Sequence, residues 1–107
     1  EPVMAFGVMG GMMQPQGQLQ VGLRVMQGAS PQAALDAPRW RVEEGFLIAV
    51  EPQCDAAWVS GLEALGHRIA RAEKSTVSFG GGQAILRHEG GWCGGSDPRR
   101  DGQAVAR

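Results

Sequence analysis

The chain has 107 residues and a formal net charge of -1, with ten basic residues against eleven acidic ones and no long run of either sign. This balance excludes the basic surface that nucleic-acid binding requires, and no apolar stretch approaches the roughly 18 residues of a membrane span. We therefore expect one domain or part of one, with neither nucleic acid nor a membrane as partner. Because the chain opens with Glu1 rather than Met, we expect a fragment of a longer protein.

The N-terminal segment contains one clear element and one ambiguous element. Residues 3–9 form a continuous apolar run, which is typical of a strand buried on both faces. Residues 18–25 alternate between polar and apolar side chains and so predict a half-buried strand. From Leu19 onward, small or apolar residues also recur at i, i+3, i+4 and i+7, as on the packing face of a helix. The pattern favours the strand and leaves the helix as the alternative.

The next segment predicts a short helix followed by two strands. Ser30 and Pro31 are the residue types preferred at an N-cap and at the first helical position. Pro38 disfavours helical geometry at the residue before it, so the helix is expected to end there. Short strands are expected at residues 39–42 and 46–50, joined by a charged turn.

The C-terminal half predicts one more helix and several strands. The helix begins with Asp55 as its N-cap and ends at Gly66. Its expected packing face carries Trp58, Leu62 and Leu65. Strands are expected at residues 67–72, 76–79, 83–88 and 91–93, with turns at residues 80–82 and 89–91. This element order predicts an α+β fold with an antiparallel C-terminal portion.

The side chains form no familiar catalytic or metal-binding motif. Cys54 and Cys93 are widely spaced, and we expect two free thiols, with a disulfide as the less favoured alternative. His67 and His88 are interpreted as surface polar residues, and together with the cysteines they match no usual zinc spacing. We therefore expect neither a metal nor a cofactor.

The glycine pair Gly10–Gly11 is the candidate site in the N-terminal segment. It follows a predicted buried strand, and two consecutive glycines leave two backbone N–H groups unshielded by side chains. Such donors can stabilise an oxyanion that develops during acyl transfer. On spacing alone, a simple tight turn is the favoured interpretation.

Three stretches of the chain resemble gamma-glutamyltransferases and their close homologues. They are residues 6–17, with the glycine pair; residues 34–40, which read ALDAPRW; and residues 95–102, which contain SDPR. The stretches occur in the family's order and extend over nearly the whole chain. The resemblance identifies residues 1–107 as the C-terminal part of the family's small subunit.

The resemblance implies part of the αββα sandwich of N-terminal nucleophile hydrolases, with mixed helices and mostly antiparallel strands, and a helix over residues 15–27. It also implies a self-cleaving precursor whose small subunit begins with a nucleophilic Thr, which lies upstream of this chain. That Thr attacks a gamma-glutamyl amide, its own amine acts as the base, and Gly10 and Gly11 supply the oxyanion hole. Arg39, Asp97 and Arg99 match motif positions, and we interpret them as structural residues, in an ion pair or a cap, rather than as ligand groups.

The implied partners are the remainder of the precursor, namely the large subunit and the N-terminal part of the small subunit, and a gamma-glutamyl substrate. The isolated fragment is expected to have no turnover and to self-associate through exposed sheet edges and a methionine-rich face. Two alternatives stay open: a glutaryl or cephalosporin acylase on the same fold, which is suggested because Val8-Met9 stand where familiar members have Ser-Pro, and a non-catalytic assembly module.

Overall fold

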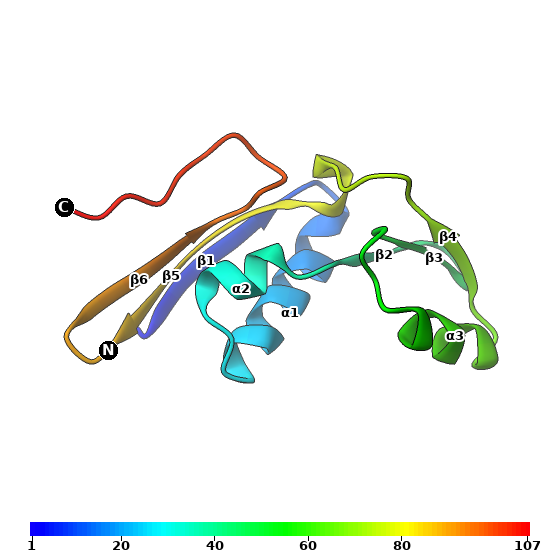
Figure 1. The fold of residues 1–107 in the computed structure, drawn as a ribbon, viewed down its shortest axis with the longest axis horizontal. Coiled ribbons are helices and arrows are strands. Elements are labelled where there is room, and N and C mark those ends of the chain that lie inside the picture. Colours follow the sequence, from blue (N-terminus) through cyan, green and yellow to red (C-terminus); the bar gives the residue numbers. More distant parts are fainter.

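A computed structural model describes residues 1–107 (Figure 1). The fold consists of two three-stranded sheets, and helices pack on one face of each sheet. The strand order is β1-β5-β6 in the first sheet and β2-β3-β4 in the second. The elements in chain order are β1 (Met4–Met9), α1 (Met13–Met26), α2 (Pro31–Asp36), β2 (Trp40–Glu44), β3 (Leu47–Val50), α3 (Ala56–Ala64), β4 (Arg68–Arg71), the 3₁₀ turn η1 (Val77–Phe79), β5 (Gly81–His88) and β6 (Gly91–Ser96).

The first sheet is antiparallel throughout, and α1 and α2 cover one of its faces (Figure 1). The core between them consists of five buried residues: Val8, Val21, Ala34, Leu35 and Ala84. The opposite face of the sheet is open except where the C-terminal segment after Ser96 runs back along it (Figure 1). The glycine pair lies at the end of β1, at the edge of this sheet.

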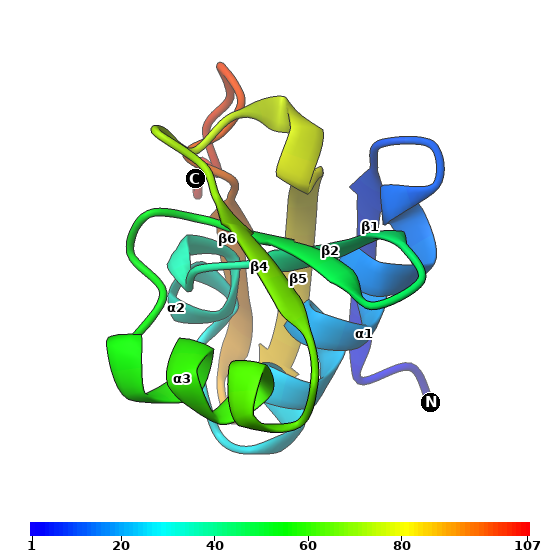
Figure 2. The same cartoon turned by 90° about the vertical axis from the view of Figure 1, so that its right-hand side faces the viewer.

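The second sheet is mixed: β2 and β3 are antiparallel, whereas β3 and β4 are parallel. α3 connects β3 with β4 and packs its buried Val59 on one face of the sheet, against Ile48 and Val50. Figure 2 shows this sheet in front of the first, with β2 running across the direction of β1 and β5. No helix of the protein is long and apolar enough to cross a membrane.

Most of the predicted elements are confirmed, together with their local causes. The Ser30 side chain accepts a hydrogen bond from the N–H of Ala33 at the start of α2, as an N-cap does. The Asp55 carboxylate likewise accepts the N–H groups of Ala57 and Trp58 at the start of α3. The strands predicted at 39–42, 46–50, 67–72 and 83–88 are present, and β5 and β6 form the expected antiparallel hairpin.

The strand favoured for residues 18–25 is wrong, because these residues lie in α1, as the family resemblance implied. The cause is packing against β1. A Cβ atom on Gly17 would lie 2.6 Å from Cγ1 of Val8, so only a glycine lets the helix approach the strand this closely. A Cβ atom on Gly22 would lie 3.4 Å from Cζ of the Phe6 ring. The pattern of polar and apolar residues along the chain cannot predict this contact between Gly17 and Val8.

Two further expectations are also wrong. Residues 76–79 form no strand: Val77–Phe79 is a 3₁₀ turn capped by the Thr76 hydroxyl, and Phe79 is buried. Gly81 and Gly82 begin β5 instead of forming a turn, and Gly82 is needed there because a Cβ would lie 2.6 Å from Cδ2 of Leu35.

The predicted burial of two elements is also incorrect. β1 is buried at Val8 but not on both faces, since one face of its sheet has no covering layer in this chain. α3 buries Val59, while Trp58 is 40% exposed and Leu65 is 76% exposed. Only Leu62 of the expected packing face contacts the core of the second sheet.

Candidate active site

The Gly10–Gly11 pair forms the turn between β1 and α1. The carbonyl groups of both glycines accept the first hydrogen bonds of the helix, from the N–H groups of Met13 and Gln14, each at 3.0 Å. The two glycine N–H groups lie outside the strand and the helix and donate to no acceptor in the chain. Both residues are exposed. The turn therefore presents two adjacent, unpaired donors at the N-terminal end of a helix, where the peptide dipoles also favour negative charge.

Glycine is required at both positions of this turn, for different reasons. Gly10 has φ +142°, and a Cβ there would lie 3.2 Å from Cβ of Met13 and 3.3 Å from Cα of Gly80. Gly11 has φ +59° with open space around it, so only its left-handed backbone demands glycine. The first glycine is fixed by close packing and the second by conformation alone.

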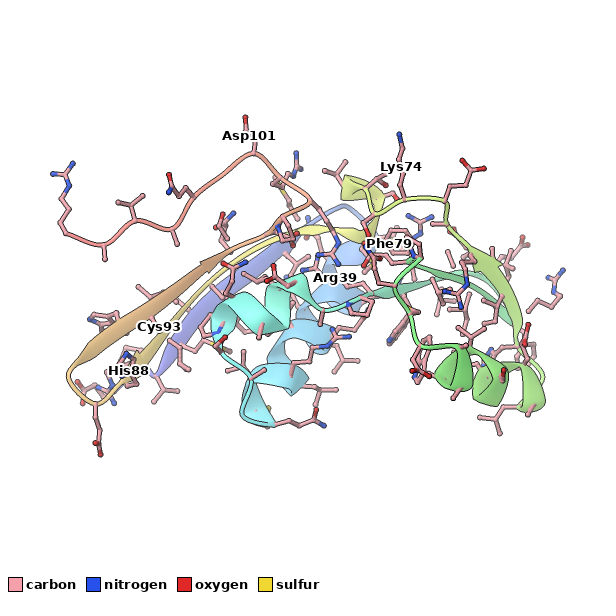
Figure 3. The ribbon with its side chains drawn as sticks, viewed as in Figure 1. Arg39, Lys74, Phe79, His88, Cys93 and Asp101 are labelled. Atoms are coloured by element: carbon pink, nitrogen blue, oxygen red, sulfur yellow. The ribbon has the colours of Figure 1, made fainter.

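A buried ionic cluster of two arginines and two carboxylates lies behind the turn. Arg39 is fully buried and donates through Nη2 to Asp97 Oδ2 at 2.6 Å. Arg99 donates through Nε to Glu51 Oε1 at 2.6 Å and through Nη1 to Asp97 Oδ1 at 3.0 Å. Of the two structural roles expected for Arg39, Asp97 and Arg99, the structure shows the ion pair. Figure 3 labels Arg39, which lies in the interior, close to Phe79.

The surroundings of Asp97 favour its charged form. Burial alone raises the pKa of Asp97, but hydrogen bonds from the N–H groups of Arg99 and Gly82 and the charge of Arg39 outweigh it, so the pKa lies below its usual value. Burial also lowers the pKa of Arg39, while the hydrogen bond to Glu51 raises that of Arg99 against the same effect. Two arginines and two carboxylates therefore face one another in the interior, where each arginine has a carboxylate partner.

The histidines and cysteines lie on elements other than the β1–α1 turn that carries the glycine pair. His67 is half-buried, with its ring 5.5 Å from that of Phe46, and His88 is exposed at the β5–β6 hairpin (Figure 3). Cys54 and Cys93 are free thiols, as predicted; Cys54 is buried, which raises its pKa, and Cys93 is half-buried. No group of three or more His, Cys, Asp or Glu side chains is arranged to hold a metal ion.

Two residues of this region were not anticipated from the sequence. Glu51 is fully buried and completes the ionic cluster, accepting the backbone N–H of Arg39 at 2.7 Å. A carboxylate directly after the apolar run of β3 was the available signal. Gly80 contacts Gly10, and no local pattern distinguishes it from the two glycines that follow it.

Comparisons with known proteins found a family and several relatives that match nearly the whole chain. The sequence model of the family described as Gamma-glutamyltranspeptidase matches residues 1–107. An oxamate amidohydrolase proenzyme of Klebsiella pneumoniae subsp. pneumoniae is 32% identical over 96% of this chain and 21% of its own length. A glutathione hydrolase-like proenzyme of Bacillus subtilis is 34% identical over 98% of this chain and 21% of its own. The crystal structure of a cephalosporin acylase from Bacillus halodurans superposes with a TM-score of 0.92 at 44% identity, covering 100% of this chain and 20% of that one. The chain thus spans about a fifth of the length of these relatives.

Proposed function

Because this chain belongs to the gamma-glutamyltranspeptidase family, we propose that it is the C-terminal part of the small subunit of an enzyme that transfers or hydrolyses gamma-glutamyl amides. The observation that carries the proposal is the pair of unpaired N–H groups at Gly10 and Gly11, at the start of α1. Donors fixed in place before the reaction are the main requirement for stabilising a tetrahedral oxyanion.

The proposed reaction is acyl transfer in two steps. The hydroxyl of a Thr upstream of this chain attacks the amide carbonyl, and the amine of that Thr takes the proton. The carbonyl oxygen becomes an oxyanion and accepts hydrogen bonds from Gly10 and Gly11. The C–N bond then breaks, the leaving amine takes the proton, and the acyl group stays on the Thr oxygen. Water or an acceptor amine attacks this ester and releases the acyl group.

The open face of the first sheet supports a partner from the same precursor. Trp92 is 58% exposed and Ile85 is 41% exposed on this face, and a groove of about 880 Å³ lies between the face and the C-terminal segment. We propose that the remainder of the small subunit supplies a second sheet here and completes the αββα sandwich. Residues 1–107 alone would then lack both the nucleophile and the covering sheet, so they would have no turnover and would self-associate.

An acylase is the second candidate function. The identity to the cephalosporin acylase is 44%, against 34% for the glutathione hydrolase-like relative. The two chemistries share the nucleophile and the oxyanion hole and differ in the acyl group that they accept. A donor panel of a gamma-glutamyl anilide, a glutaryl amide and oxamate, assayed with the complete protein, separates them. Absence of turnover on every donor would favour the assembly module instead.

The oxyanion assignment is tested with Gly11→Ala and the control Gly28→Ala in the complete protein. Both glycines have positive φ, +59° at Gly11 and +100° at Gly28, and no atom within 4 Å of an added Cβ, so both substitutions strain the backbone without a steric clash. Of these two variants, only Gly11→Ala changes a glycine with a proposed donor role. Losing one oxyanion donor costs about 100- to 1000-fold in kcat. We expect Gly11→Ala to lower kcat at least about 10-fold, because it misorients rather than removes the N–H, and Gly28→Ala to keep it. Equal kcat values in both variants would overturn the assignment.

A further inference from the structure

The backbones of Gly10 and Gly80 are in direct contact, although they are far apart in the sequence. A Cβ on Gly10 would lie 3.3 Å from Cα and 3.7 Å from the nitrogen of Gly80. A Cβ on Gly80, whose φ is +87°, would lie 2.6 Å from Cγ1 of Val8 and 3.3 Å from the carbonyl oxygen of Met9. Gly80 therefore forms a closely fitted support beneath Gly10, with no side chain between the two backbones.

The position of Gly80 is fixed by Arg39. Nη1 of Arg39 donates to the carbonyl oxygens of Phe79 at 3.2 Å and Gly80 at 3.1 Å. Nη2 donates to Asp97 Oδ2 at 2.6 Å, and the same oxygen accepts the N–H of Gly82 at 2.8 Å. Arg39 and Asp97 are both completely buried. The Arg39–Asp97 ion pair therefore holds the backbone at both ends of the Gly80–Gly82 segment. The interior around it is close-packed, so these atoms have little freedom to shift.

We propose that Arg39 is a positioning residue for the reaction. By binding the carbonyl of Gly80, it fixes the position of the Gly10 backbone and therefore the orientation of the Gly10 N–H. This inference rests on the proposed function of the glycine pair. The role requires arginine at this position, because the planar guanidinium reaches three carbonyl oxygens and a carboxylate together, whereas the ammonium of lysine is a single point of charge. A displacement of about 1 Å at a catalytic donor costs roughly 100-fold in rate.

Arg99 provides the matched control within the same ionic cluster. It also bonds to Asp97, and it binds Glu51 and the carbonyls of Leu35 and Ala37, but it makes no hydrogen bond to Gly80. Arg39→Lys and Arg99→Lys therefore both disturb the buried charges, and only Arg39→Lys releases the support of Gly10.

The experiment uses the complete protein, with its two subunits expressed as separate chains so that self-cleavage is not required. For each variant, kcat, KM, the unfolding midpoint and the Ki of a boronate analogue of the tetrahedral intermediate are measured. We expect Arg39→Lys to lower kcat about 10- to 100-fold, to change KM less than about threefold, and to weaken the analogue in proportion to kcat/KM. At a similar loss of midpoint, Arg99→Lys should lower kcat far less. Equal kcat losses in the two variants would overturn the inference.

A second pair of variants leaves the ionic cluster intact and decides the question if Arg39→Lys does not fold. In Gly80→Ala and in Gly17→Ala the new Cβ lies 2.6 Å from Cγ1 of Val8, so both press on the same side chain. Only Gly80 contacts Gly10. We expect kcat to fall in Gly80→Ala with KM retained, and to stay near the parent value in Gly17→Ala. An active Gly80→Ala beside an inactive Gly11→Ala would overturn this inference alone, whereas an active Gly11→Ala would overturn the proposed function.

Discussion

Replacing Asp97 with Asn tests whether the buried ionic cluster holds the C-terminal segment onto the first sheet. The carboxylate accepts four hydrogen bonds: Oδ2 from Arg39 Nη2 and the N–H of Gly82, and Oδ1 from the N–H and Nη1 of Arg99. An asparagine has one oxygen and one NH₂ group. Whichever way it is turned, its NH₂ faces two donors, so no orientation restores the pattern.

The expected cost follows from the charge that this substitution leaves unpaired. With Asp97 neutralised, two buried arginines share the single carboxylate of Glu51, and removing one partner of a buried pair costs about 3–5 kcal/mol. Because 1.36 kcal/mol corresponds to a factor of ten, 3 kcal/mol corresponds to an opening equilibrium more than about 100-fold larger. The effect should be concentrated in β5, whose Gly82 N–H loses its acceptor.

Hydrogen exchange measured by mass spectrometry on the complete protein reports this opening locally. We expect the amides of residues 81–88 to exchange more than about 100-fold faster in Asp97→Asn than in the parent. Asp101→Asn, an exposed change in the same segment, is the control and should stay within about 0.5 kcal/mol of the parent. Exchange in Asp97→Asn that matches the Asp101→Asn control would refute the reasoning.

Three further predictions concern acid stability, thiol reactivity and packing. The pKa of Asp97 is lower in the folded state than in the unfolded chain. The stabilisation that the Asp97 carboxylate gives the fold is therefore complete above the ordinary pKa of an aspartate and is lost as the pH falls below about 4. In that range the unfolding midpoint should drop in the parent and drop less in Asp97→Asn. Cys54, which is buried and has a raised pKa, should react with an aromatic disulfide at pH 8 more slowly than Cys93, and equal rates would contradict its burial. Leu35→Ala should lower the unfolding free energy in urea by about 2–5 kcal/mol, since the side chain is fully buried against Gly82, and a smaller loss would show that the site can collapse.

The sequence by itself determined the helix ends and the nature of the ionic residues. Ser30 with Pro31, and Asp55, mark helix starts because a capping side chain bonds to backbone within a few residues of itself. The SDPR and ALDAPRW stretches identified the family, and the charged residue types indicated structural roles for Arg39 and Asp97, which pair with each other in the structure. These features depend on interactions between residues close in the chain or on a shared family pattern. Both can be recognised from the sequence alone.

Residue periodicity did not decide the identity of α1, and only the tertiary structure showed the surroundings of the glycine pair. Residues 18–25 satisfy both a strand and a helix pattern; the family resemblance favoured the helix, and the structure shows where Gly17 of that helix meets Val8 across the core. The contact of Gly80 with Gly10 and the burial of Glu51 likewise join residues that no local rule connects. Side-chain preferences act over a few residues, whereas these contacts depend on how whole elements pack, because a close-packed interior admits only the arrangement in which every such surface fits.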